Sequence, residues 1–301
     1  MSISVLTNTA SMNAQRNLAA SQTSLSASIG RLSSGMRINS AGDDAAGLGI
    51  SENLKANIRS MAQAQRNTND GVSMSQVAEG AMDDMQGIVS RMRELAVQSS
   101  NGTLGSTERG YIQTEFTQLS GEINRIGAVT NFNGQKLLDG SASAGLTFQV
   151  GINNTANDRI SMSITKLTTS TLGSASLHVA SASLSTVTNA RAAMGVFDKA
   201  IQQLSTAAKA QSAIGAFDKA IQQLSQARAK VGATQNRLSV TVSNLASQQE
   251  HLSAANSRIR DVDVASETAA MTKSQILSQA GLAVLAQANQ LPQSALSLLR
   301  G

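Results

Sequence analysis

Both ends of this chain carry apolar residues at a strict seven-residue spacing, with almost no charge around them. The first 42 residues contain three arginines and no acidic residue, and residues 268–301 contain Lys273 and Arg300 as their charged side chains. A heptad repeat predicts helices that pack along one seam, as in a coiled coil. The predicted seam residues are Leu18, Leu25 and Leu32 at the start of the chain, and Leu277, Val284, Leu291 and Leu298 at its end.

The surroundings of these seams indicate assembly. An exposed helix normally surrounds its seam with charged residues, whereas small uncharged polar residues fill the remaining positions here. A helix of this kind is only weakly stable alone. Its polar faces suit contact with neighbouring copies in a close-packed assembly, and we therefore expect polymerisation through the chain ends. The alternative interpretation is a pair of solvent-exposed terminal helices.

The composition favours long helices over a compact globule. Aromatic residues make up 2% of the 301 residues, and the chain has one proline, so little interrupts a helix and few rings fill a core. Residues 45–98 carry apolar residues near three-to-four spacing and predict one long helix, which turn residues 99–102 end. A second amphipathic helix follows, with apolar positions at Ile112, Phe116, Leu119, Ile123 and Ile126.

Near the middle of the chain the apolar period changes. An Asn-Gly turn signal lies at residues 133–134, and apolar residues alternate with others over 146–152 and 160–164. This pattern predicts a β-hairpin. The sequence GVFDKAIQQLS at 195–205 then recurs as GAFDKAIQQLS at 215–225, and residues 215–260 predict a long returning helix. The predicted fold is mainly α-helical, a long antiparallel coiled coil or bundle formed by both chain ends, with a small β-hairpin region in the middle.

Several function classes are disfavoured. The chain has no cysteine, and its two histidines, His178 and His251, are far apart in the sequence, so we expect no metal, cofactor or catalytic site and no enzyme. Its 24 Lys and Arg residues are scattered rather than clustered, which argues against nucleic-acid binding despite a net charge of +5. No apolar run reaches the ~20 residues of a membrane span. The N-terminus lacks the basic and apolar regions of a cleaved signal peptide, which alone would predict a cytoplasmic protein.

Two pairs of aspartates lie beside predicted helix ends. We expect Asp43 and Asp44 to complement the positive N-terminus of the helix that follows them, rather than to hold a metal. We expect Asp261 and Asp263 to form surface ion pairs with neighbouring arginines.

Six long stretches in both halves of the chain identify a family. They are RLSSGMRINSAGDDAAGLGIS at 31–51, RMRELAVQSSNGT at 91–103, NFNGQKLLDG at 131–140, AKVGATQNRL at 229–238, SAANSRIRDVDVASETAAMTKSQILSQAG at 253–281 and VLAQANQLPQSALSLLR at 284–300. Together they resemble the bacterial flagellins. The middle of the chain departs from that family: its variable outer domains are absent or reduced to residues 141–190, and the 20-residue duplication is not a family feature.

The resemblance implies a structural subunit of the flagellar filament used for swimming. It implies export in an unfolded state through the flagellar type III apparatus without a cleaved signal, which replaces the cytoplasmic expectation by a secreted, extracellular one. The implied partners are further copies of the chain, the flagellar cap and hook-junction proteins, and an export chaperone on the C-terminal helix. The implied segments are an N-terminal inner-core helix (1–44), outer-core helices (45–140), a hairpin and variable region (141–190), a returning outer-core helix with the duplication (191–255) and a C-terminal inner-core helix (256–301).

The resemblance also implies recognition by a host Toll-like receptor. The matching positions are Arg91, Leu95 and Gln98 on one predicted helix and Glu115 on the next. The alternative is that these residues make subunit contacts in a filament. Two other classes share some of these features: a hook–filament junction protein would have similar terminal heptads but not both terminal motifs, and a signalling coiled coil such as a chemoreceptor would lack the β-hairpin.

Overall fold

The computed structural model describes residues 8–172 and 207–300, and the chain divides into two compact units. Unit 1 joins the described residues up to Arg59 to those from Gln249 onward, and unit 2 runs from Ser60 to Gln248. Two long helices, α2 (Ala45–Ser99) and α5 (Ala207–Arg260), contribute to both units. The first copy of the duplicated sequence, at 195–205, lies outside the described residues.

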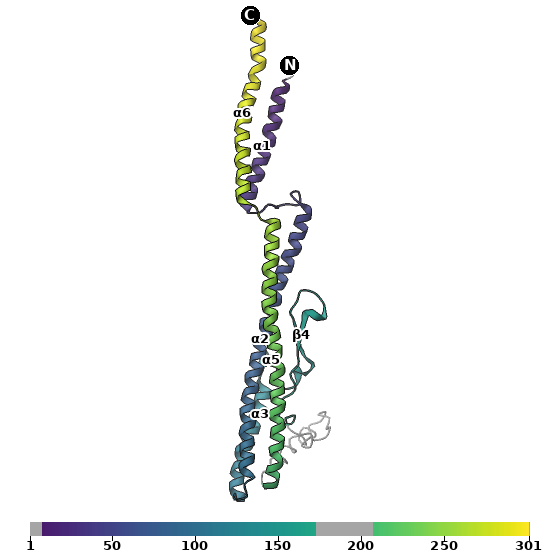
Figure 1. Ribbon diagram of the computed structural model, residues 1–301, viewed down its shortest axis with the longest axis vertical. Coiled ribbons are helices and arrows are strands. Elements are labelled where there is room, and N and C mark those ends of the chain that lie inside the picture. Colours follow the sequence, from purple (N-terminus) through teal and green to yellow (C-terminus); the bar gives the residue numbers. More distant parts are fainter. Residues whose placement is uncertain (1–7, 173–206, 301) are drawn as a thin grey trace. The chain divides into compact units, whose positions relative to one another are not determined.

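In unit 1 the two ends of the chain form an antiparallel helix pair (Figure 1). Helix α1 spans Thr9–Ser34 and helix α6 spans Val264–Arg300. The amide Nδ2 of Asn8 donates to the carbonyl of Ala288 at 2.8 Å, which joins the start of α1 to a late turn of α6. Helix α1 ends at Gly35, whose φ of 69° is a left-handed conformation that favours glycine.

Unit 2 is a helical bundle. Helices α2 and α5 run antiparallel, with Arg93 bonded to Asp218 at 2.7 Å and Arg228 to Asp83 at 2.8 Å. Helix α3 (Ser106–Val129) packs beside them. Its core is rich in methionine, an unbranched side chain that fills irregular gaps. Residues at the centre of this core include Met82, Met85, Met92, Leu95, Phe116, Ile123, Leu224 and Val231.

The turn between α2 and α3 is fixed by Arg109. Its guanidinium donates to the carbonyl of Ser99 at 3.0 Å and to the carbonyl of Asn101 at 2.9 Å. Carbonyl groups at the end of a helix lack partners within the helix, so these bonds satisfy two acceptors at the end of α2. The predicted long helix, its end and the amphipathic helix after it are confirmed.

The middle of the chain contains two small antiparallel hairpins. Strands β1 (Asn131–Phe132) and β2 (Gln135–Lys136) are joined by Asn133 and Gly134, both with positive φ, as the Asn-Gly signal predicts. Strands β3 (Leu146–Gln149) and β4 (Arg159–Met162) pair with Leu146 opposite Met162 and Phe148 opposite Ile160.

The β3–β4 hairpin approaches the helices closely at a glycine. A Cβ atom on Gly71 of α2 would come within 3.1 Å of both the Phe148 ring and the Leu238 side chain. Glycine therefore lets Phe148 pack directly on α2. The predicted fold, mainly helical with paired chain ends and a central hairpin, is confirmed.

Candidate assembly site

Helix α1 turns a regular face of alternating Ser and Leu or Ala toward α6. Ala14 and Ser28 are buried, and Leu18, Leu25 and Leu32 are half-buried on the same three-to-four pattern. Leu18, Leu25 and Leu32 of the predicted polymerisation seam therefore lie on the face of α1 that contacts α6. Ile29 is 51% exposed and lies off this face.

The two described C-terminal residues of the predicted polymerisation seam lie outside the contact between α1 and α6. Leu277 and Val284 are 48% and 58% exposed in α6. Leu291 and Leu298 lie in α6 beyond the side chains that the structure describes. The residues of α6 that are buried or half-buried at three-to-four spacing are Met271, Ser274, Ser278, Gly281, Leu285 and Ala288.

The small residues explain this choice of seam. A Cβ atom on Gly281 would lie 3.3 Å from Leu18 Cδ1 and 3.9 Å from its Cα. The backbones are therefore so close at Gly281 that a large side chain at this position would separate the helices. The Leu277 and Val284 positions are left on a flank of the helix, available to another molecule.

Helix α6 carries apolar side chains on more than one exposed face. Val264, Ile276 and Leu282 are 62%, 60% and 53% exposed, in addition to Leu277 and Val284. At ~100° per residue, Leu282 lies on the opposite flank from Val284, and Ile276 lies away from the α1 seam. A helix that is apolar on several faces is one that several neighbours bury.

Two connectors join the helix pair to α2 and α5, and their backbones are bonded to each other. The amide of Arg37 donates to the carbonyl of Arg260 at 2.6 Å, and the amide of Val262 donates to the carbonyl of Gly35 at 3.1 Å. Ile38 is buried in this joint, 1% exposed. A side chain on Gly47 would meet both Ile38 and Asp44. The joint is therefore a packed, hydrogen-bonded structure that needs residues from both ends of the chain.

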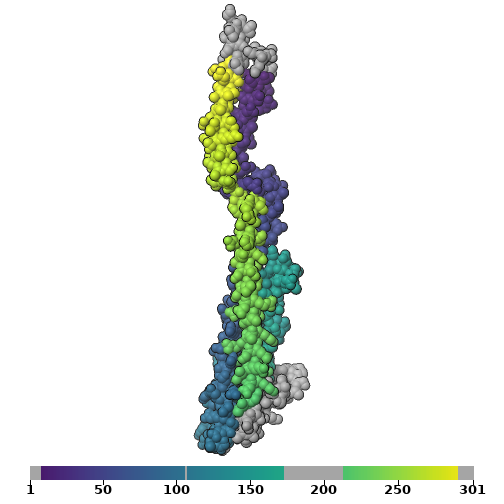
Figure 2. All heavy atoms as spheres, viewed as in Figure 1, coloured from purple at the N-terminus to yellow at the C-terminus, as the bar shows by residue number. Residues whose placement is uncertain are grey.

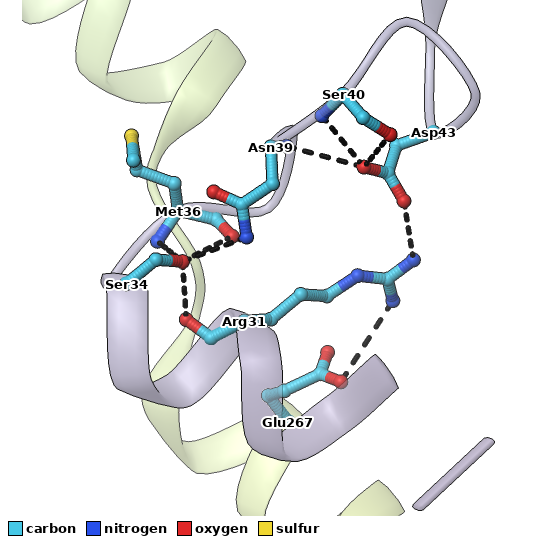
Figure 3. Close-up of polar contacts among 7 residues, drawn as sticks. All are labelled: Arg31, Ser34, Met36, Asn39, Ser40, Asp43 and Glu267. Atoms are coloured by element: carbon cyan, nitrogen blue, oxygen red, sulfur yellow. Dashed lines mark hydrogen bonds and ion pairs between the residues drawn. The ribbon is translucent and has the colours of Figure 1, made fainter. Parts of the chain in front are cut away.

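Arg31 links three parts of unit 1 (Figure 3). One guanidinium nitrogen lies 3.7 Å from Asp43 in the connector, and another lies 3.7 Å from Glu267 on α6. Asp43 Oδ2 also accepts hydrogen bonds from the amides of Ser40 at 2.9 Å and Asn39 at 3.2 Å. The Ser40 amide above all, then the Ser40 hydroxyl and the Asn39 amide, holds the pKa of Asp43 below its ordinary value.

The expectation for the two aspartate pairs holds for Asp44 only, because Asp43 has another role and neither Asp261 nor Asp263 forms an ion pair among the described residues. Asp44 does complement the start of α2, because its Oδ1 accepts the amide of Gly47 at 2.8 Å. Asp43 instead shapes the connector. Asp263 forms the N-terminal cap of α6, accepting the amides of Ala265 and Ser266. Arg260 pairs with Glu52 at 2.6 Å rather than with an aspartate.

The joint was not predicted because its partners are far apart in the sequence. Arg31 and Glu267 are typical solvated charges when each is considered alone. The scarcity of charge near both chain ends is the one signal that could have singled them out, because Glu267 is the last acidic residue in the chain.

Comparison with known proteins identifies the family. The family model for the bacterial flagellin N-terminal helical region matches residues 5–143, and the model for the C-terminal helical region matches residues 214–299. A flagellin of Halalkalibacterium halodurans is 44% identical over 97% of this chain and 98% of its own length. The flagellar filament 33 kDa core protein of Treponema phagedenis is 41% identical over the same shares of both chains.

The chain belongs to the bacterial flagellin family. Flagellins are structural subunits of the flagellar filament, and this one is a filament protein. The C-terminal family match begins at residue 214, so the second copy of the duplicated sequence lies within the matched flagellin region and the first lies before it. A solved flagellar hook-associated protein from Vibrio parahaemolyticus shares the fold, with a TM-score of 0.57 at 15% identity over 73% of this chain and all of the other.

The four predicted receptor residues of this flagellin lie near the end of α2 and on α3. Arg91 bonds to Glu94 at 3.0 Å and to Glu115 at 2.9 Å, and the Glu115 bond above all raises the pKa of the Arg91 guanidinium. Gln98 is exposed. Leu95 is 1% exposed and belongs to the core, so three of the four residues present polar groups at the surface.

Membrane-spanning helices and metal sites are absent from the residues that the structure describes. No helix among them is long and apolar enough to cross a membrane. No three His, Asp or Glu side chains in the described ranges come together as they would around a metal ion.

Proposed function

We propose that this flagellin polymerises through its two terminal helices into the extracellular filament that drives swimming. The observation that carries the proposal is the set of exposed apolar side chains on α6, which the partner helix α1 leaves uncovered. The helix pair contains few charges to keep such faces in water, since α6 has Glu267, Lys273 and Arg300 in 37 residues. Neighbouring copies of the same helix pair are the occupants that a filament supplies.

The free energy for ordering the ends comes from this burial. Fixing a residue's backbone costs roughly 1–2 kcal/mol, and covering a Leu, Ile or Val side chain returns roughly 1.5–3 kcal/mol. One helix pair with a seam of Ser, Ala and Gly returns little, because small side chains bury little apolar area. Terminal segments that are disordered in the free subunit and fold on docking at the filament tip fit this balance.

The proposal extends to export and partners. Export as an unfolded chain without a cleaved signal suits ends that are weakly stable alone. Helix α6 exposes apolar faces before assembly, so a chaperone that covers this helix in the cytoplasm prevents premature association. The cap and hook-junction proteins are the proposed neighbours at the two ends of the filament. The role is structural and needs no catalytic group, cofactor or metal.

The five sequence segments become a proposed layout of the filament. The segments 1–44 and 256–301 form its inner core, and 45–140 and 191–255 form its outer core, with the hairpin and variable region at 141–190. The pair Arg91 and Glu115, with Gln98 nearby, is the proposed contact for a host Toll-like receptor. Leu95 supports the shape of that surface from the core rather than touching the receptor.

A substitution on the flank of α6 tests the proposal. Val284→Asp should prevent polymerisation of purified subunits seeded with filament fragments, because a carboxylate cannot be buried without a partner. Val284→Ile is the matched control and should polymerise as the unchanged chain does. Circular dichroism of both variants should show the same melting of the unit 2 bundle. Normal filaments from Val284→Asp would contradict the proposed role of this face.

A further inference from the structure

A groove in unit 2 runs between the β3–β4 hairpin and α5. It has a volume of about 700 Å³. Its floor is apolar, formed by Met61, Val150, Ile160 and Leu245, each less than 10% exposed. Figure 2 shows the hairpin segment, in teal, standing out from the side of α5, in green. We call this feature the amide groove, after the side chains around it: Asn153, Asn157, Asn236, Arg237, Asn244 and Gln248.

The rim that α5 contributes to the amide groove consists of polar side chains. Within the described residues, the side chains of Asn236, Arg237, Asn244 and Gln248 make no hydrogen bond or ion pair. Each side-chain amide offers donors and an acceptor, as a peptide unit does. Uncharged amides above an apolar floor therefore suit an extended or turning main-chain segment. Two charged residues also line the groove: Asp158, whose carboxylate accepts from the Thr155 hydroxyl and packs on Gly151, and Arg237, which forms no ion pair among the described residues and offers its charge to an acidic group.

The hairpin wall of the groove is rigid. Gln149 Nε2 donates to the carbonyls of Gly151 and Asn153, both at 2.9 Å, and its Oε1 accepts from Arg159 at 3.2 Å. A Cβ atom on Gly151 would overlap the Asp158 carboxylate, so the loop is closed tightly around that glycine. A preformed wall loses little entropy when a partner binds.

The turn from α2 into α3, with the first residues of α3, has the complementary chemistry. Residues 100–108, which we call the tip, contain exposed Asn101, Gly102 and Thr103, whose backbone is held by Arg109 and by the bond from the Thr103 amide to Asn101 Oδ1. The tip carries one acidic residue, Glu108, whose carboxylate folds back over Gly105 and has no ion pair among the described residues. Among the described residues, Glu108, an acid without an ion pair beside exposed main chain, is complementary in charge to Arg237, a cation without an ion pair beside the amides of the groove.

The tip and the groove of one subunit cannot meet. The groove is beside Leu238, which contacts Gly71 on α2. Helix α2 continues for about 28 residues from Gly71 to Ser99 before the tip begins. At 1.5 Å per residue the tip lies about 40 Å along the bundle from the groove. Both belong to unit 2, so this separation is fixed by one continuous helix.

We propose that the amide groove binds the tip of a second copy of this chain, with Glu108 of one copy paired to Arg237 of the next. Two different patches on one subunit that bind each other form a head-to-tail contact, and such contacts generate open helical polymers when they do not close into a ring. This inference rests on the proposed filament role and adds to the terminal helices a second, named contact between subunits.

A charge exchange tests the pairing. Arg237→Glu and Glu108→Arg should each raise the critical concentration for seeded polymerisation about tenfold or more, because each places like charges opposite one another. The double variant Arg237→Glu with Glu108→Arg should return to within about threefold of the unchanged chain. Lys230→Glu is the matched control, since Lys230 is another exposed cation on α5, and it should polymerise normally.

The absence of cysteine from the chain allows a direct second test. Filaments of Gly102→Cys with Asn244→Cys should give a ladder of disulfide-linked multimers on oxidation, whereas Gly102→Cys with Lys230→Cys should not. Single variants that polymerise like the unchanged chain, or a double variant as impaired as the singles, would contradict the groove pairing alone. Failure of the unchanged chain to polymerise would contradict the filament role as well.

Discussion

Leu18 of α1 packs against the backbone of α6 at Gly281, where an added Cβ atom would lie 3.3 Å from the leucine Cδ1. This contact sets the spacing of the terminal helices and decides which residues α6 keeps inside. It leaves Leu277 and Val284 outside the pair, where they are free to contact other subunits.

Filament stability should depend on the size of the side chain placed at Gly281. Gly281→Ala should leave filament stability unchanged or raised, because a shift of the flexible Leu18 methyl admits one carbon and alanine favours helix by about 1 kcal/mol over glycine. Gly281→Ile should lower stability by roughly 1–3 kcal/mol through overpacking. The measurement is the temperature at which preformed filaments dissociate. Equal temperatures for the two variants would show that the helices do not approach closely here.

Acid should loosen the joint through Asp43. Its pKa is held below the ordinary value of about 3.9 by hydrogen bonds, chiefly from Ser40, so the folded state favours the charged form. A group with a lowered folded pKa stabilises fully above its unfolded pKa, and this contribution disappears as pH falls through the folded value. Amide exchange at Asn39 and Ser40 in filaments should therefore be constant from pH 7 to about 5, apart from intrinsic rates, and lose protection below about pH 4.

Asp43→Asn should remove this acid dependence and give weaker protection at every pH. Asp70→Asn is the matched control, because the Asp70 side chain has no hydrogen bond or ion pair among the described residues. Protection that falls with pH in the same way in Asp43→Asn as in the unchanged chain would exclude Asp43 as its source.

Substituting the phenylalanine of each copy should show which copy of the duplicated sequence packs in the unit 2 bundle. Phe217 lies edge-on to Phe116, with ring centroids 5.6 Å apart. Because Phe217 is half-buried, Phe217→Ala should lower the free energy of unfolding of unit 2 by roughly 2–3 kcal/mol. Phe197→Ala, in the first copy and before the region matched by the family, should change it by less than about 0.5 kcal/mol. Thermal unfolding followed by circular dichroism compares the two, and similar losses would mean that both copies pack.

The fold could be predicted where one short period dominates. The stripe from Ile112 to Ile126 gave α3, and the alternation around Phe148 and Ile160 gave the β3–β4 hairpin. The face of α1 that contacts α6 could also be found, because Leu18, Leu25 and Leu32 are the large residues on a helix whose other positions are mostly small.

The residues of α6 that face α1 could not be predicted from the sequence, because this helix is apolar in several directions. More than one heptad fits its sequence, and the one that contains Leu277 and Val284 is not the one that faces α1. Gly281 and Ala288 contribute little to a hydrophobic pattern because their side chains are small. Small residues nevertheless face α1 where the two backbones approach closely.

The joint and the amide groove could not be predicted from local patterns. Arg31 pairs with Glu267, which is far from it in the sequence. The amides around the groove come from two separate segments, the hairpin and α5. Their chemistry arises only when distant segments lie together. A single sequence has no period or spacing that predicts the joint or the groove.

Seeded polymerisation of the full chain beside a version trimmed to residues 45–255 tests the central claim most directly. Both would be incubated with filament fragments and imaged by negative-stain electron microscopy. Assembly through the terminal helices predicts filaments from the full chain and none from the trimmed one, with the unit 2 bundle still folded in both. Filaments of ordinary length from the trimmed chain, or a full chain that remains a small oligomer beside the seeds, would contradict it.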